Sequence, residues 1–183
     1  MKKIILSILF LFLSGITFLY VKGRGEDAIF LLPKGYEGGV ITLFGVPNGV
    51  PIEYEEGKRI YRIPKTGILR TQFSMKTGRQ THEFFYIDSL GNRIEILQLW
   101  KLRLQMNESF IGKSDEYIDQ LYIKMIRDTT KSVIAPTEGY GVVGDLKYHI
   151  FSVGRFSKLN AVGMQASNMM FDLMDELKKE RGF

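Results

Sequence analysis

The amino-acid sequence predicts a mainly β protein of the α+β class: an antiparallel β-sandwich or barrel with an N-terminal transmembrane or signal helix and about two added helices, one of them C-terminal. Three observations lead to this prediction. Between Ala28 and Leu104, short β-branched and aromatic runs alternate with turn residues at intervals of roughly 8–12 residues. Helical periodicity appears only after Met106. An uncharged apolar run stands close to the start of the chain.

The uncharged, mostly apolar run from Ile4 to Val21 follows Lys2 and Lys3 and is typical of a segment that directs a chain across a membrane. As a helix rising ~1.5 Å per residue it would span ~27 Å, close to the ~30 Å of a hydrocarbon core. A signal peptide usually has a shorter apolar region and a small-x-small cleavage site. The run therefore favours a retained anchor, with cleavage after Gly23 as the alternative.

Two parts of the chain are accordingly expected: a signal peptide or membrane anchor over residues 1–23, and a single extracytoplasmic β-rich domain with a C-terminal helix over residues 24–183. With the anchor retained, the protein is a single-pass protein of the cell membrane. With cleavage after Gly23, it is secreted or periplasmic. The sequence has no cysteine, so a lipobox lipid anchor, disulfides, zinc–thiolate sites and thiol catalysis are all excluded.

Several segments between Ala28 and Leu104 have the composition of strands, and proline, glycine and Asn-Gly sequences separate them. These segments are Val40–Phe44, Ile52–Tyr54, Ile60–Ile63, Ile68–Ser74, Thr81–Asp88 and Arg93–Leu104. The last is expected to be the longest strand, because its side chains alternate between two faces. No helix-length segment separates the strands, and this argues against parallel βαβ units.

The second half of the chain has a helical pattern in two places. Ser114 is a suitable N-cap for a helix that runs to about Arg127. Strands are expected over Thr129–Ala135 and Lys147–Val153. The last element is a helix from about Asn160 to Arg181, and its apolar stripe consists of Val162, Ala166, Met169, Met170, Leu173 and Leu177.

The apolar face of this last helix is broader than packing against one sheet requires, because Phe171 and Met174 lie beside the main stripe. Met170, Phe171 and Met174 are therefore the candidate surface for a protein partner. Methionine suits such a surface, because its flexible thioether adapts to irregular contacts.

The net charge of +5 does not indicate a nucleic-acid partner. Three of the 25 basic residues precede residue 24 and none of the 20 acidic residues does, so the remaining chain is close to neutral. A nucleic-acid-binding protein would instead show a clustered basic face.

The segment Gly139–Gly144 matches the pattern G-x-G-x-x-G letter for letter. A dinucleotide site needs a helix to begin there and an acidic residue about 20 positions later. The chain continues instead as the expected strand Lys147–Val153, so a flexible loop or a β-bulge is favoured over a nucleotide site. The carboxylates Glu53, Glu55 and Glu56 fit no calcium-loop spacing, and a solvated turn is favoured there.

The two histidines, His82 and His149, lie within expected strands beside aromatic residues. Histidine is the side chain best suited to acid–base work near neutral pH. Neither histidine belongs to a metal-ligand motif, and no nucleophile elbow is present, so structural roles are favoured. No catalytic, cofactor-binding or metal-binding residue is assigned, and no cofactor is expected.

Two segments resemble an uncharacterised family of exported bacterial proteins, a domain of unknown function. They are Leu31–Val40, which reads L-L-P-K-G-Y-E-G-G-V, and Ile63–Thr71, which reads I-P-K-T-G-I-L-R-T. The resemblance covers about residues 29–105 and implies an envelope location and a compact β-rich domain, but it supplies no catalytic residue. Many relatives would carry a lipobox cysteine, which this chain lacks. The opening is also similar to transthyretin-like β-sandwiches.

These observations predict a membrane-tethered or exported envelope protein that acts as a binding module. Its partners would be the membrane, through Ile4–Val21, and an envelope protein, a peptide or a glycan; no nucleic acid is expected. One alternative is an envelope hydrolase with a histidine site assembled by the fold, which requires His82 and His149 to lie close together or beside other catalytic groups. The other is an immunity or inhibitor protein held at the membrane.

Overall fold

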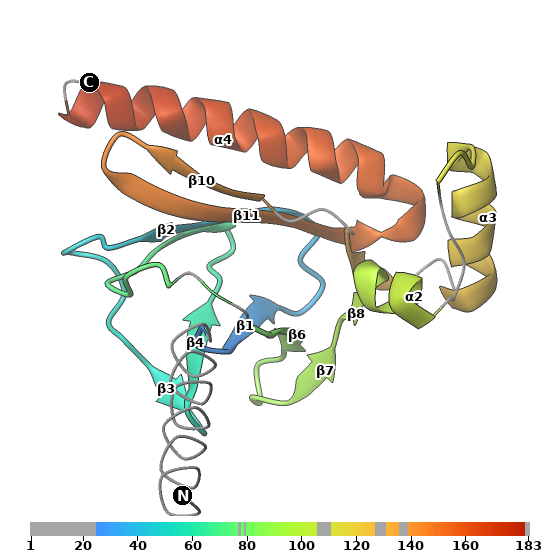
Figure 1. The fold of residues 1–183 in the computed structure, drawn as a ribbon. Coiled ribbons are helices and arrows are strands. Elements are labelled where there is room, and N and C mark those ends of the chain that lie inside the picture. The colour runs from blue at the N-terminus through green and yellow to red at the C-terminus, as the bar shows by residue number, and fades with distance from the viewer. Residues whose placement is uncertain are drawn as a thin grey trace, which may run out of the picture.

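Two β-sheets pack face to face, and the C-terminal helix α4 lies along the outer side of one of them (Figure 1). The computed structural model describes residues 25–76, 78, 80–105, 111–126, 131–135 and 139–181. The predicted anchor Ile4–Val21 lies outside the described residues. None of the helices that the structure describes is both long enough and apolar enough to cross a membrane.

The first sheet has the strand order β3-β4-β1-β6-β7, and the second has the order β5-β2-β11-β9-β8 with β10 paired to β11. The strands are β1 (Ala28–Pro33), β2 (Gly38–Phe44), β3 (Tyr54–Glu55), β4 (Lys58–Arg62), β5 (Ile68–Arg70), β6 (His82–Ile87), β7 (Arg93–Glu95), β8 (Leu97–Gln98), β9 (Ser132–Ile134), β10 (Gly139–Val143) and β11 (Leu146–Arg155). The helices are α2 (Leu99–Gln105), α3 (Asp115–Ile126) and α4 (Leu159–Arg181), with a short 3-10 helix η1 (Phe156–Lys158) before α4.

The prediction of an antiparallel sandwich or barrel is correct for the two packed β layers and only partly correct for the strand directions, because each sheet contains both antiparallel and parallel pairs. β1 pairs in parallel with both β4 and β6, and β2 pairs in parallel with β5. Between the two strands of each of these parallel pairs, the chain passes through the opposite sheet. The second strand can therefore run in the same direction as the first without a connecting helix. Both sheets keep open edges in the described part of the chain, so the barrel alternative is also wrong.

The core between the sheets is aromatic. The Phe30 ring of β1 stacks on Phe84 at 5.0 Å and meets Phe151 of the opposite sheet edge-on at 5.3 Å. Strand alternation explains this placement, because every second residue of β1, β6 and β11 points to the same side. The buried members of this cluster are Ala28, Phe30, Leu32, Val40, Phe44, Tyr61, Ile63, Leu69, Phe73, Phe84, Ile96, Ile134, Phe151 and Val153.

Helix α4 covers the outer face of the second sheet, as its apolar stripe predicts. Met170, Leu173 and Leu177 pack on Ile41 and Leu43 of β2. The other predicted stripe positions, Val162, Ala166 and Met169, are buried or partly buried too. The predicted helix boundaries differ from the observed ones by one residue at the N-terminal end.

The contact between β2 and α4 depends on Gly39. A Cβ at this position would lie 2.5 Å from both Cα and Cβ of Ala166, so the helix backbone would have to move. Gly39→Ala is expected to lower the free energy of unfolding by about 1–3 kcal/mol. Gly163→Ala on α4, where a Cβ meets nothing within 4 Å, is the matched control and should raise it by about 1 kcal/mol. Urea unfolding measures both, and a neutral Gly39→Ala would contradict this close approach.

The prediction of one long strand over Arg93–Leu104 is wrong. The segment forms the short strands β7 and β8 and then turns into helix α2. Leu99 and Leu102 lie on one side of α2, where they pack on Tyr122 and Ile126 of α3. Apolar residues spaced in this way fit both a strand and a helix, and the packing against α3 selects the helix. The structure therefore describes three helices beyond residue 24 rather than two.

The prediction of a flexible loop or bulge over Gly139–Gly144 is also wrong, because these residues form strand β10 and the tight turn that leads into β11. Gly144 has a φ of 57° at this turn. A Cβ at Gly141 would lie 2.4 Å from the Tyr148 hydroxyl, so glycine lets the Tyr148 ring lie across β10. The glycines serve a hairpin, and no helix begins among them.

The N-cap prediction for α3 is confirmed. The backbone N–H of Tyr117 donates to Oγ of Ser114 at 3.3 Å, and Asp115 and Glu116 occupy the first turn.

Candidate functional site

The two histidines of the chain lie together between the sheets. His82 starts β6 in the first sheet, His149 lies on β11 in the second, and their ring centroids are 5.1 Å apart. The Tyr140 ring of β10 stacks on His149 at 4.5 Å, and its hydroxyl lies 3.3 Å from Nε2 of His82. We call these three residues the histidine–tyrosine cluster. The sequence could not show the proximity of the two histidines, because β6 and β11 are distant in sequence and belong to different sheets.

A buried arginine lies beside this cluster. Arg59 is 4% exposed, and its Nη1 donates to the Ser74 carbonyl at 2.7 Å and to the Tyr61 hydroxyl at 3.3 Å. Its Nε donates to the Glu26 carboxylate at 2.5 Å, and the guanidinium lies 4.7 Å above the Phe73 ring. The hydrogen bond from Arg59 lowers the pKa of Glu26, and burial raises the pKa of Tyr61.

The space at this cluster is too small for a substrate. The cavity lined by Arg59, Tyr61 and the histidine–tyrosine cluster has a volume of about 10 Å³, roughly the room that one water molecule needs. His149 is only 1% exposed. Among the residues that the structure describes, no three His, Asp or Glu side chains gather to hold a metal ion. The arrangement can tie the two sheets together by ring stacking and hydrogen bonding, and the cavity beside it has no room for a bound substrate.

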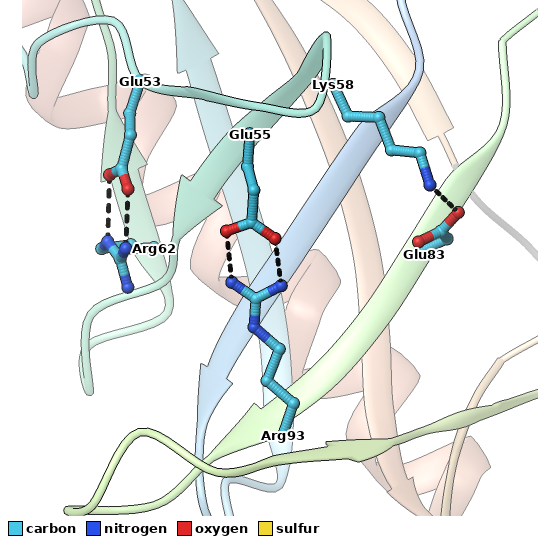
Figure 2. A network of polar contacts seen from close by, with 6 residues as sticks. All are labelled: Glu53, Glu55, Lys58, Arg62, Glu83 and Arg93. Atoms are coloured by element: carbon cyan, nitrogen blue, oxygen red, sulfur yellow. Dashed lines mark hydrogen bonds and ion pairs between the residues drawn. The ribbon is translucent and has the colours of Figure 1, made fainter.

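The glutamates near the β3–β4 turn do not converge on a common point. Figure 2 shows that Glu53 takes both of its hydrogen bonds from Arg62, at 3.0 and 2.6 Å, and that Glu55 takes both of its own from Arg93, at 2.6 and 2.7 Å. These hydrogen bonds lower the pKa of both carboxyl groups. Their oxygens already have charged partners, so this turn forms a surface ion-pair network.

A larger groove lies at the start of α4. It has a volume of about 730 Å³, and we call it the α3–α4 groove. The residues that line it are Leu99, Asp119, Tyr122, Ile123, Ala135, Ser152, Phe156, Ser157, Leu159, Asn160, Gly163 and Met164. The ring centroids of Tyr122 and Phe156 lie 5.9 Å apart, with the ring planes tilted by 56°. Patterns in the sequence do not reveal this groove, because its walls combine β11, η1 and three helices that meet only in the fold.

The predicted partner surface divides in two. Met170 is buried against the second sheet and Met174 is partly buried there, whereas Phe171 is 66% exposed. Met164, seven positions earlier, is exposed on the same side of the helix. Binding of a protein partner through this surface stays a prediction. Of its three residues, Phe171 is the one whose side chain is mostly exposed.

The loop Pro47–Pro51 also borders a groove. Asn48, Gly49 and Val50 face Leu173 and Glu176 of α4 across a space of about 490 Å³. Arg70 donates to Glu176 at 2.9 Å across this space, so an ion pair of the chain itself already occupies part of it.

Comparison with known proteins identifies a family. A family of unknown function (DUF6843) matches residues 24–134, which is more than half of the chain. The chain belongs to this family. The resemblance inferred from the Leu31–Val40 and Ile63–Thr71 segments is thereby confirmed. The DUF6843 match includes Arg59 and His82 and ends before β10, β11 and α4, so Tyr140 and His149 lie beyond it.

No curated protein matches the chain. Among solved structures, it is similar to the 2.75 Å crystal structure of a candidate lipoprotein from Bacillus anthracis, with 16% sequence identity and a TM-score of 0.49. The match covers 85% of this chain and 96% of that one. A likeness at this level supports no conclusion about function.

Sequence reasoning missed Arg59 and Tyr140. The alternation of β4 offered a signal for the first, because it places Arg59 on the same face as Tyr61, which belongs to the core. Tyr140 lay within a segment predicted to be a loop, so nothing placed it against a histidine.

Proposed function

We propose that this DUF6843 protein is an exported envelope protein, tethered to the membrane through Ile4–Val21, which binds an apolar segment of another envelope protein in the α3–α4 groove. One observation carries the proposal: the groove has a volume of about 730 Å³, whereas the cavity at the histidine–tyrosine cluster has about 10 Å³. Grooves of roughly 300–1,000 Å³ with apolar walls and a few polar groups are the usual form of binding sites.

The chemistry of the walls favours a peptide with a basic flank. Aromatic and aliphatic side chains form most of the surface, and Asp119 supplies a carboxylate. Asp115 and Glu116 lie one turn earlier on α3, whose only cation is Lys124. A partner segment with apolar anchors and a neighbouring lysine or arginine would complement both properties.

The other two functions fit this geometry less well. A hydrolase would need a substrate to reach the histidine–tyrosine cluster, and the cavity there has room for about one water molecule. An inhibitor or immunity protein would be a special case of the proposed binding, in which the captured partner is an enzyme and loses its activity when bound.

Site-specific photo-crosslinking in intact cells tests the proposal. A photoreactive amino acid replaces Met164 on the rim of the groove in the full-length protein, and the control carries it at Leu90, an exposed residue on the β6–β7 turn. A discrete protein adduct from position 164, absent from position 90, is expected. Adducts of the same pattern from both positions, or none from position 164, would overturn the proposal.

A pair of variants on one helix makes the test specific. Ile123→Lys places a cation on the groove wall and should abolish the adduct from position 164. Tyr117→Lys makes a comparable change on α3 outside the groove and should leave the adduct intact. Both positions are substantially exposed, so thermal unfolding should show a similar Tm for the two variants.

A further inference from the structure

We infer that the end of the domain at which β1 begins rests on the headgroups of the lipid bilayer, so that the α3–α4 groove faces away from the membrane. We call this surface the β1 end; it comprises Gly25–Asp27, Lys76, Gln80, Tyr140 and the β10–β11 turn. The inference rests on the membrane tether of the proposed function and adds the orientation of the domain on the membrane.

The chain is held firmly where it enters the fold. The Glu26 carboxylate accepts hydrogen bonds from Arg59 and, at 3.0 Å, from the Tyr54 hydroxyl. The Asp27 carbonyl accepts from the backbone N–H of Arg59 at 2.9 Å, and Oδ1 of Asp27 accepts from the backbone N–H of Thr81 at 2.8 Å. The direction in which the chain leaves the domain is therefore fixed by contacts on both sides of β1.

The tether leaves little slack. Only Lys22, Gly23 and Arg24 separate Val21, the last residue of the apolar run, from Gly25. A fully extended chain spans at most ~3.6 Å per residue, so the four residue steps from Val21 to Gly25 reach about 14 Å. The β1 end must accordingly lie within about 14 Å of the point where the apolar run ends, which is the depth of the headgroup layer and its adjacent water.

The β10–β11 turn belongs to the same end. Ala28 pairs with His82, and His82 lies opposite His149. The residues that precede His149 on β11, and those that follow Tyr140 on β10, therefore extend beyond the first residue of β1. This part of the hairpin includes the exposed Val142 and Lys147, which form a register pair.

The side chains of the β1 end suit the headgroup layer of a bilayer. The exposed Tyr140 and Val142 provide the aromatic and apolar groups that settle at headgroup level. Lys76 and Lys147 are exposed at the same end. The acids of this end are Glu26, which pairs with Arg59, Asp27, Asp145 at the β10–β11 turn and Glu56 at the β3–β4 turn. The β1 end therefore carries charges of both signs.

The groove lies at the other end of the domain. β11 starts beside the β10–β11 turn and finishes at Arg155, where η1 and α4 begin and the groove opens. Figure 1 shows α2 and α3 at the end of the molecule opposite the β10–β11 turn. A domain resting on its β1 end thus presents the groove to partners in the extracytoplasmic space.

Because the chain has no cysteine, single labels test the orientation directly. Full-length protein carrying Val142→Cys or Leu90→Cys is labelled with a fluorophore and reconstituted into phospholipid vesicles that contain a lipid with a nitroxide headgroup. Val142 is 61% exposed at the β1 end, and Leu90 is 85% exposed on the β6–β7 turn at the opposite end of β6. Strong quenching at position 142 with little at position 90 is expected. Equal quenching at the two positions, or stronger quenching at position 90, would overturn the inference.

A control separates the possible failures. Flotation of the vesicles reports the tether alone: protein that does not float contradicts the tether and the orientation together, whereas floating protein with the wrong quenching pattern contradicts the orientation only.

Discussion

A fragment of residues 24–134, the span that matches DUF6843, is expected to remain unfolded, whereas residues 24–183 unfold cooperatively. Strand β11 pairs with β2 on one side and with β9 on the other, so its removal divides the second sheet. Removing α4 exposes Ile41 and Leu43 of β2 to water. Circular dichroism and urea unfolding of the two fragments measure the difference.

The energetic balance explains why this loss should be complete. Phe151, Val153, Met170, Leu173 and Leu177 are all buried and all lie beyond residue 134. Each buried side chain of this kind contributes about 1.5–3 kcal/mol, and a typical domain is stable by only about 5–15 kcal/mol. The deleted contacts therefore match or exceed the whole stability of an ordinary domain. A cooperative urea transition of residues 24–134 would show instead that the second sheet forms without β11.

Sequence patterns within a short segment correctly predicted the strands, the helix and the helix cap that depend only on residues of that segment. The strand over Lys147–Val153 lies within β11, and the stripe of the last helix packs as expected, because period-2 and period-3.6 patterns follow from burial on one face. Ser114 likewise caps α3 through a contact three residues away. These predictions needed no knowledge of which elements become neighbours.

The predictions that failed concern which strands become neighbours in the fold. Turn residues between β1 and β2 show that the chain reverses, but they do not show that β2 joins the opposite sheet and that β4 returns parallel to β1. The same limit applies to the candidate site. His82 and His149 come together only because their strands face each other across the core, and no spacing in the sequence encodes this contact.

Replacement of Arg59 by methionine is expected to lower the free energy of unfolding by about 2–3 kcal/mol, below the ~3–5 kcal/mol for breaking a fully buried ion pair, because Glu26 keeps some contact with water. Methionine fills the space but donates no hydrogen bond, so the Ser74 carbonyl and Glu26 lose the guanidinium. Arg62→Met on the same strand is the matched control. Arg62 forms a two-bonded pair with Glu53 on the exposed face, and its loss should cost less than about 1 kcal/mol.

The pH dependence distinguishes an ion pair from mere packing at Arg59. Its hydrogen bond lowers the pKa of Glu26 in the folded protein, so this pair stabilises the fold above the pKa of the unfolded carboxyl group. That stabilisation disappears as the pH falls through the folded-state pKa of Glu26. Glu26→Gln should therefore flatten part of the acid side of the stability profile, measured by urea unfolding over a pH series, and Arg59→Met should flatten the same part. If both variants kept the full pH slope of the natural protein, the carboxylates responsible for it would lie elsewhere in the chain.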